Sequence, residues 1–208
     1  MSEKLPNKIP VFPLRSAIFF PETNLPLNIF EPRYLKMVDK AIKHDGYLGM
    51  IQSKEIDGEV FNIGCLGKIN ENKKTEDGRI LINLFGLSRF KILKEIDNGE
   101  PFREFNVNYD LFKSDIKQSS SVDEKILNVL IQNSKKLFEK YSMILNWKEL
   151  SRLKNSQQIY TLVMISPFSV SEKQKLLEIP EINEIAKTFV EITNFAFYED
   201  SSKDNIIQ

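Results

Sequence analysis

The chain has 208 residues, of which 41% are hydrophobic and 28% are charged, so it can bury one large core or two small ones. Its formal net charge is zero, which gives no overall electrostatic attraction to nucleic acid or to an anionic membrane. One cysteine excludes an intrachain disulfide and is typical of a reducing compartment. No signal peptide and no run of about 18 apolar residues is found, so we expect a cytoplasmic protein without a membrane partner.

The first half of the sequence predicts short strands. Residues 9–14 are apolar but contain Pro10 and Pro13, which cannot donate ladder hydrogen bonds, so we expect an edge strand or an irregular one. An Asp77-Gly78 pair predicts a hairpin turn. Further strands are predicted over residues 25–30, 46–52, 61–72, 79–87, 88–96 and 102–112. Such a series favours a small mixed sheet or barrel.

A corner in the chain follows residues 25–30. Pro32 suits the first turn of a helix, which the apolar spacing predicts over residues 32–44. Glu31 can cap this helix with its carboxylate or lie at the positive end of the helix dipole. Arg33 can reach a carboxylate or a carbonyl, and Tyr34 can bury its ring. These residue types fit a structural joint, and a working site is the alternative.

The sequence changes character at residues 113–121, a polar, serine-rich run that predicts a linker. After it the apolar residues recur with helical spacing. Capping-box patterns begin at Ser121 and Ser169, and Asn146 is expected to open a helix that continues to residue 162. Pro180 separates the third helix from a fourth over residues 181–197. We therefore expect a β-rich subdomain over 1–115, a helical bundle over 120–198 and a flexible tail over 199–208.

Patterns for catalysis or cofactor binding are missing from the sequence. Glycine-rich phosphate loops and dinucleotide fingerprints do not occur, and Gly64 and Gly67 are typical of a bulge or of close backbone packing. Cys65 and His44 are each the only residue of their type, so we expect a buried, inert thiol and a histidine beside a helix C-terminus. No catalytic residue, metal site or cofactor is predicted.

Several motifs occur together in a fixed order. The stretches are "IPVFPLRSAIFFPETNLPLNIFEPRYLKMV", "GCLGKI", "EDGRILINLFGLSRFKI" and "EKQKLLE". In this order, from about Ile9 to about Phe197, they resemble the N-terminal, substrate-binding domain of the Lon ATP-dependent protease family. One position departs from the family pattern, because Glu22 stands where the family has a glycine after Phe-Pro.

The resemblance implies an α+β fold, with a PUA-like β-rich subdomain (a twisted sheet or pseudo-barrel with one or two helices) followed by a helical bundle. It implies a role in recognising protein substrates, and our first hypothesis is a module that binds unfolded or damaged polypeptides and presents them to a separate ATP-dependent protease. In full-length Lon the domain precedes ATPase and Ser-Lys protease modules that have no counterpart in these residues, so we do not expect an enzyme. The candidate peptide-binding residues are Glu31, Arg33, Tyr34, Arg79, Arg89 and Phe90.

Three other functions remain open from the sequence. The first is a hydrolase acting alone, and the second is an RNA-binding protein, since PUA-like folds include RNA binders. Zero net charge argues against nucleic acid as a partner. The third is a scaffold that self-associates as a homodimer. For Arg79 and Arg89, a salt bridge at the sheet rim is the alternative to binding.

Overall fold

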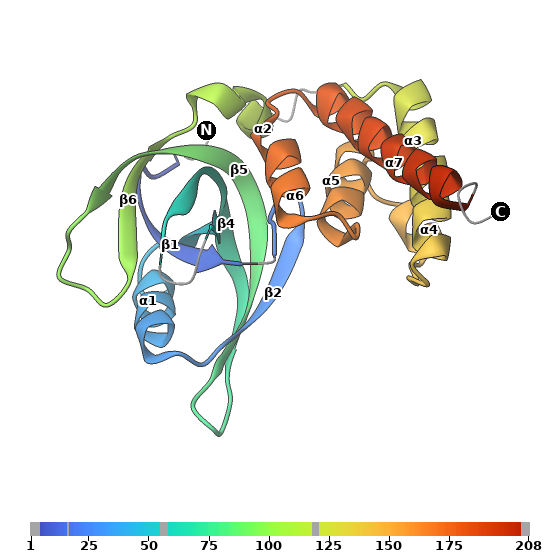
Figure 1. The fold of residues 1–208 in the computed structure, drawn as a ribbon. Coiled ribbons are helices and arrows are strands. Elements are labelled where there is room, and N and C mark those ends of the chain that lie inside the picture. Colours follow the sequence, from blue (N-terminus) through green and yellow to red (C-terminus); the bar gives the residue numbers. More distant parts are fainter. Residues whose placement is uncertain (1–4, 16, 55–57, 118–120, 205–208) are drawn as a thin grey trace. The chain divides into compact units, whose positions relative to one another are not determined.

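The computed structural model contains two units, residues 1–118 and residues 119–208. It describes residues 5–15, 17–54, 58–117 and 121–204. The first unit is built mainly of strands and the second of helices (Figure 1), which confirms the expected α+β class. The proposed subdomain limits of 1–115 and 120–198 stay a prediction. No helix in the described part of the chain has an apolar stretch long enough to span a membrane.

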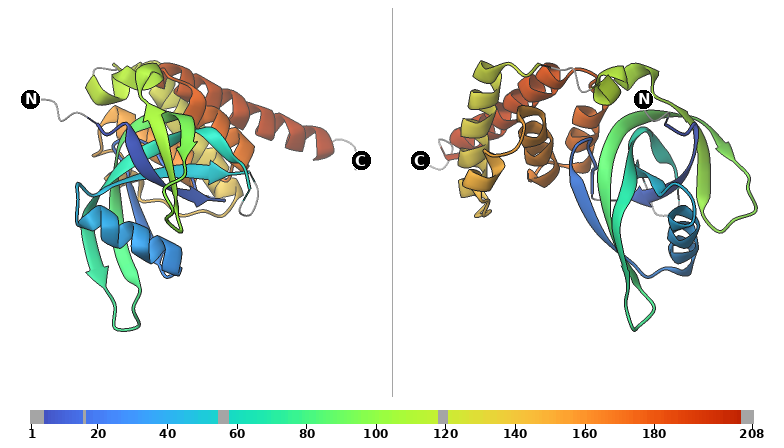
Figure 2. Two further views of the ribbon diagram at one scale, coloured as in Figure 1. Left: turned by 90° about the vertical axis from the view of Figure 1, so that its left-hand side faces the viewer. Right: turned by 180° about the vertical axis from the view of Figure 1, so that it is seen from behind.

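The strands of the first unit close into a ring. Its elements are β1 (Lys8–Leu14), β2 (Asn24–Ile29), α1 (Pro32–Ile42), β3 (Tyr47–Ser53), β4 (Val60–Lys74), β5 (Ile80–Ile96), β6 (Arg103–Asn108), the 3-10 helix η1 (Asp110–Phe112) and α2 (Lys113–Lys117). The order is β2-β5-β4-β3-β1-β6, and β6 pairs again with β5. Both views in Figure 2 show α1 beside this ring and the β4–β5 hairpin projecting beyond it.

One long strand, β5, makes this closure possible. Two strands were expected over residues 79–87 and 88–96, and that prediction is wrong because β5 is continuous over 17 residues. Its residues 80–91 pair with β4, whereas its residues 91–96 pair with β6. The strand therefore changes partner along its length, and this change joins β6, at one end of the strand order, back to β5.

Of the two possibilities given for residues 9–14, an edge strand or an irregular one, the edge strand is wrong. Strand β1 lies between β3 and β6, but each ladder uses a different half of the strand. Residues 8–11 pair with β6 and residues 11–14 pair with β3. The two ladders overlap only at Val11. Each of the two prolines, Pro10 and Pro13, therefore lies in a part of the strand that is paired on one side only.

Large side chains fill the inside of the ring. The buried cluster consists of Ile9, Val11, Tyr47, Ile51, Leu66, Phe90, Phe105 and Val107. Glycines make room for them: a Cβ on Gly64 would overlap the Met50 carbonyl oxygen and lie 2.7 Å from the Phe90 ring. The β4–β5 register shifts between Leu66 and Gly67. The interpretation of Gly64 and Gly67 as marks of close packing and of a bulge is therefore confirmed.

A buried ion pair fixes the end of the first unit. The Arg89 side chain is 0% exposed and that of Asp115 is 2% exposed. Arg89 Nε and Nη2 donate to the two Asp115 carboxylate oxygens over 2.9 and 2.8 Å, and the Arg89 backbone N–H donates to Asp115 Oδ2 over 2.9 Å. The Arg89 guanidinium also lies 4.5 Å from the centre of the Phe112 ring. This pairing holds α2 against β5.

Helix α2 corrects the prediction of a linker over residues 113–121, because residues 113–117 are helical. Asp115 is the physical reason, since its buried carboxylate anchors this part of the run to Arg89. Residues 118–120 lie outside the described residues.

The second unit is a bundle of helices. Its elements are α3 (Glu124–Lys140), α4 (Trp147–Leu150), α5 (Asn155–Ile165), α6 (Val170–Glu178) and α7 (Ile182–Asp204). The capping box at Ser169 is confirmed, whereas α3 is capped by Asp123 and not by Ser121. Asn146 caps α4 as expected, but the helix predicted from it divides into α4 and α5.

Helices α3 and α7 lie side by side and run parallel. The Asp123 backbone N–H donates to Asn183 Oδ1 over 2.9 Å, and Asn133 Nδ2 donates to Thr193 Oγ1 over 2.8 Å. Both contacts join residues sixty apart, which fixes the direction. Helix α7 continues to Asp204, so it overlaps the tail expected over 199–208; residues 205–208 lie outside the described residues.

Glu22, which stands where the family pattern has glycine, lies in the left-handed region with φ of 58°. Its backbone N–H donates to the Gly86 carbonyl over 2.9 Å, which holds this conformation. A Cβ costs about 1–2 kcal/mol in this region of φ, whereas glycine loses about 0.5–1 kcal/mol more chain entropy than alanine on folding. Glu22→Gly should therefore be more stable than Glu22→Ala by about 0.5–1 kcal/mol. Chemical denaturation of the two variants, which both lack the carboxylate, measures this difference. Equal stability of the two variants would show that the backbone of residue 22 is not strained.

Candidate functional site

The corner between β2 and α1 is a rigid joint. Glu31 has extended backbone angles (φ −70°, ψ 132°), and its carbonyl accepts hydrogen bonds from the N–H groups of Tyr34 and Leu35, both over 2.9 Å. Pro32 lies in the first turn, as predicted. Of the two roles given for Glu31, capping by its carboxylate is wrong, because that side chain makes no capping hydrogen bond, whereas its place at the N-cap position agrees with a charge at the positive end of the helix dipole.

The side chains of the corner contact one another instead. Arg33 Nε donates to Glu31 Oε2 over 3.0 Å, and the Arg33 guanidinium lies 4.6 Å from the centre of the Tyr34 ring. The buried Tyr34 ring packs on Phe12 of β1, with ring centres 4.1 Å apart. The corner thus attaches the start of α1 to β1 and leaves the Glu31–Arg33 pair half-exposed.

A hollow of about 390 Å³ opens at this joint, and we call it the corner hollow. Its apolar lining comes from the end of β1, the end of β2 and the start of α1: Phe12, Pro13, Leu14, Leu27, Ile29, Phe30 and Tyr34. Phe30 is unusual among these because 64% of its surface is exposed. The exposed ring and the apolar part of the lining together offer a contact surface to a partner.

A second hollow, of about 330 Å³, adjoins the first, and we call it the polar hollow. Both hollows are lined by Pro13, Arg33, Tyr34 and Ser53. Arg103 lines the polar hollow and donates to the Glu95 carboxylate through Nε over 2.6 Å and through Nη2 over 2.7 Å. These hydrogen bonds hold the pKa of Glu95 below its usual range, so the pair stays ionised at neutral pH.

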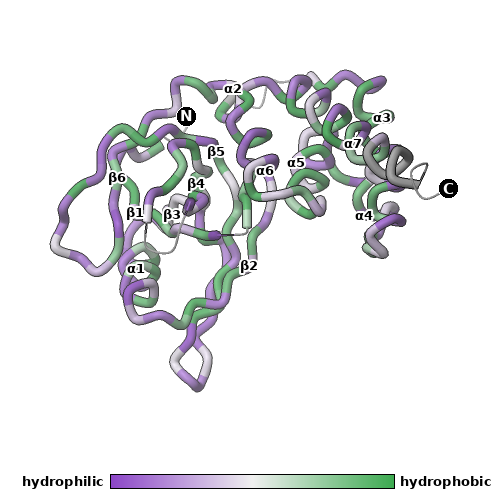
Figure 3. The backbone as a smooth tube through the Cα atoms, in the orientation of Figure 1, coloured by the Kyte–Doolittle hydropathy of each residue, from purple (hydrophilic) through white to green (hydrophobic). Residues whose placement is uncertain are grey.

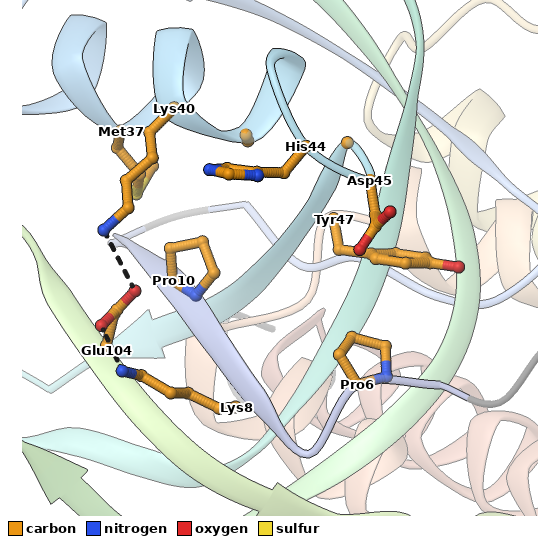
Figure 4. A pocket seen from close by; sticks show the side chains of 11 residues that line it. Pro6, Lys8, Pro10, Met37, Lys40, His44, Asp45, Tyr47 and Glu104 are labelled. Carbon is orange, nitrogen blue, oxygen red and sulfur yellow. Dashed lines mark ion pairs between the residues drawn. The ribbon is translucent and has the colours of Figure 1, made fainter.

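A third hollow, of about 140 Å³, lies at the opposite end of α1 (Figure 4). Glu104 lies between two lysines there: Lys8 Nζ is 3.2 Å from Glu104 Oε2 and Lys40 Nζ is 3.9 Å from Oε1. His44 also lines this hollow, just past the end of α1, where the sequence predicted a histidine beside a helix C-terminus. Because Glu104 and the lysines compensate one another, we interpret this hollow as an ionic joint between α1, β1 and β6.

The same network extends along α1. Lys36 Nζ lies 2.8 Å and Lys40 Nζ 3.4 Å from the two Glu100 oxygens. The Lys36 hydrogen bond, with that from Lys40, lowers the pKa of Glu100. The charges that follow α1 therefore hold the helix in place, and the apolar corner hollow is the better candidate for binding.

The six predicted binding residues lie in three different places. Glu31, Arg33 and Tyr34 are together at the corner hollow. The β4–β5 hairpin has a hydrophilic end (Figure 3). Arg79 directly precedes β5 in this hairpin, and its Nη2 is 2.6 Å from Asp77 Oδ2. That ion pair matches the alternative given for Arg79.

Arg89 and Phe90, the last two of the six, are both 0% exposed. Arg89 holds α2 and Phe90 fills the ring, so a partner on the surface cannot reach either side chain in this structure. Their assignment to a binding surface therefore has no structural support. The salt bridge expected for Arg89 is present, but it lies in the interior and not at the rim.

The sequence analysis missed Phe30, Phe12, Leu14 and Arg103 as residues of the site. A signal existed for Phe30: Leu27 and Ile29 alternate along β2, which places the next residue on the opposite side of the strand. No signal existed for Arg103, because its position beside Arg33 depends on pairing between strands far apart in the sequence.

Cys65, the only cysteine of the chain, lines none of the three hollows. The Cys65 thiol is fully buried and donates to the Leu66 carbonyl over 3.6 Å. Burial raises the pKa of this thiol well above its ordinary value, so the nucleophilic thiolate is disfavoured. Within the described residues, no cluster of three or more His, Cys, Asp or Glu side chains could hold a metal ion.

Comparison with known proteins identifies the same family over most of the chain. The model of the ATP-dependent protease La (LON) substrate-binding domain matches residues 8–194. Lon protease of Buchnera aphidicola subsp. Acyrthosiphon pisum is 28% identical over 190 residues, and Lon protease of Escherichia coli K12 is 26% identical over 191 residues. Each alignment covers 85% of this chain and 23% of the relative, so the chain spans less than a quarter of their length.

Two solved structures share the fold. The N-terminal domain of Mycobacterium avium complex Lon protease superimposes with a TM-score of 0.66 at 16% identity, covering 90% of this chain and 98% of that one. A Lon N-terminal domain protein from Xanthomonas campestris gives 0.64 at 16% identity, covering 88% and 97%.

Proposed function

Because the chain belongs to the family of the Lon substrate-binding domain, we propose that it binds unfolded or damaged polypeptides and that the corner hollow receives one of their apolar side chains. As part of this proposal the chain acts without catalysis of its own, in the cytoplasm, and presents the bound segment to a separate ATP-dependent protease.

The observation that carries the proposal is the exposed Phe30 beside the corner hollow. A cavity of about 390 Å³ is within the range of sites that bind small molecules, and it has room for a large side chain of an extended segment. Burying such a side chain contributes about 1.5–3 kcal/mol. An unfolded chain offers apolar side chains in water, whereas a folded one keeps most of them in its core, so the hollow favours unfolded polypeptides.

Phe30→Ser should weaken the binding of an unfolded polypeptide about 5- to 30-fold, because about 1–2 kcal/mol of apolar contact is lost. Fluorescence anisotropy with a reduced, carboxymethylated protein measures the dissociation constant, and the native form of the same protein should bind far more weakly. If the bound segment is passed on, the wild-type chain should also change the rate at which a purified ATP-dependent protease degrades that polypeptide, and Phe30→Ser should do so less.

The chain contains a matched control for this experiment. Phe195 on α7 is also 64% exposed, but it belongs to the second unit and does not line the corner hollow. Phe195→Ser removes the same side chain from the same degree of exposure, and it should leave the dissociation constant unchanged. Equal losses in the two variants, or equal binding of folded and unfolded forms, would overturn the proposal.

A further inference from the structure

Charges at the two adjoining hollows do not cancel. Five charged side chains line them among the described residues: Arg15, Glu31, Arg33, Glu95 and Arg103. Glu31 pairs with Arg33 over 3.0 Å, and Glu95 pairs with Arg103 over 2.6 Å. No ion pair joins Arg15 to another described residue, so among the described residues one positive charge is left uncompensated at the corner hollow.

The positive charge of Arg15 lies next to the apolar lining of the corner hollow. Arg15 directly follows Leu14, the last residue of β1, and both residues line the corner hollow. Leu14 is half-buried and Arg15 is exposed, so the charge lies at the rim while the apolar lining continues inward. Neighbouring residues of an extended polypeptide are about 3.3 Å apart along the chain, so a residue next to the inserted side chain stays near the rim.

We propose that Arg15 makes the corner hollow selective for polypeptide segments in which an acidic residue stands next to the inserted apolar side chain. This inference rests on the proposed function, since it assumes that the corner hollow receives that side chain. The other two arginines contribute less to the selection, because a ligand carboxylate would have to displace Glu31 or Glu95 from them.

The expected size of the selectivity is modest. Ion pairs between exposed groups contribute about 0.2–1 kcal/mol, which corresponds to an affinity ratio of at most about fivefold. Salt screens such pairs, since the Debye length falls to about 3 Å in 1 M salt. Burial of the apolar side chain therefore determines most of the binding affinity. Among segments that carry such a side chain, Arg15 favours those with an acidic neighbour.

Three labelled peptides that differ at one position test this inference. Each contains one phenylalanine in a Gly/Ser background, flanked by glutamate, glutamine or lysine. With the wild-type chain at low salt, the glutamate peptide should bind about 1.4- to 5-fold more tightly than the glutamine peptide, and the lysine peptide more weakly than both. The three dissociation constants should converge in 1 M NaCl. Arg15→Gln should remove the order, and Arg15→Glu should reverse it.

Lys91→Glu is the matched control, because it makes the same change in net charge at an exposed residue of β5 that lines neither hollow. It should leave the order of the peptides unchanged, and an effect equal to that of Arg15→Glu would overturn the inference. If the glutamine peptide binds and Phe30→Ser weakens it, but the three peptides bind equally, the inference fails while the proposed function stands. If no peptide binds, both fail.

Discussion

Replacing Asp115 with alanine should lower the free energy of unfolding of the first unit by about 3–5 kcal/mol, because it leaves the fully buried Arg89 guanidinium without its counter-charge. The same substitution removes the acceptor of three hydrogen bonds, one of them from the Arg89 backbone N–H. Guanidinium denaturation followed by far-UV circular dichroism measures the loss, and hydrogen exchange of the β5 amides locates it.

A matched control is Glu95→Gln, which removes the charge from the exposed Arg103–Glu95 pair and should cost less than about 1 kcal/mol. Replacing both partners of the buried pair with apolar residues, in Arg89→Met with Asp115→Leu, should restore part of the loss, because the backbone N–H of residue 89 still lacks its acceptor. Fluorescence of Trp147, the only tryptophan, reports on the second unit within the same sample. If Asp115→Ala costs no more than Glu95→Gln, the buried pair does not hold α2 as described.

Gly86→Ala should destabilise the first unit by about 3 kcal/mol or more. A Cβ at this position would overlap the Phe20 carbonyl oxygen and lie 3.0 Å from Pro21 Cα, and both are backbone atoms that cannot move aside as a side chain can. Gly86 is also held from both sides, because its N–H donates to the Thr23 carbonyl and its carbonyl accepts from the Glu22 N–H, each over 2.9 Å. Denaturation curves of the full chain measure the cost.

The control for this substitution is Gly78→Ala at the end of the β4–β5 hairpin. Gly78 has φ of +83° and no atom within 4 Å of an added Cβ, so its replacement should cost only about 0.5–1 kcal/mol, the backbone strain less the chain entropy that alanine saves. The difference between the two variants isolates the steric overlap at Gly86. Similar losses of stability in the two variants would show that the backbone around Phe20 shifts at little cost to accommodate the added Cβ.

Local signals in the sequence were enough to predict several elements. Pro32 marks the start of α1, Asp77-Gly78 marks the β4–β5 turn, and Ser169 with Glu172 marks the start of α6. In each case the residues that determine the conformation are adjacent in the chain, so a single sequence contains the whole signal. The change from strands to helices near residue 120 is of the same kind, because it follows from the spacing of apolar residues.

Features that depend on distant pairs could not be predicted in this way. From the sequence, Arg89 was expected at the rim of the sheet. Its charge can be buried because Asp115 pairs with it, and this contact joins residues that are distant in the chain. The prolines of β1 indicated an edge strand, since the division of its two ladders at Val11 depends on the positions of β3 and β6. For the candidate site, the corner residues are adjacent in the chain and could be proposed from the sequence, and their role in binding stays a prediction. The polar hollow joins β5 and β6 to α1 and was missed.

The position of β2 has a consequence for solubility. Closure of the sheet leaves β2 paired only with β5, so within the described residues it is the strand most open to pairing with another molecule. Pro26 stands in the middle of its six residues and has no N–H to offer to an incoming strand. Pro26 therefore opposes the pairing of β2 with a strand of another molecule, which is the step that would begin fibrillar stacking. This protection matters in a protein that contains 15 phenylalanines.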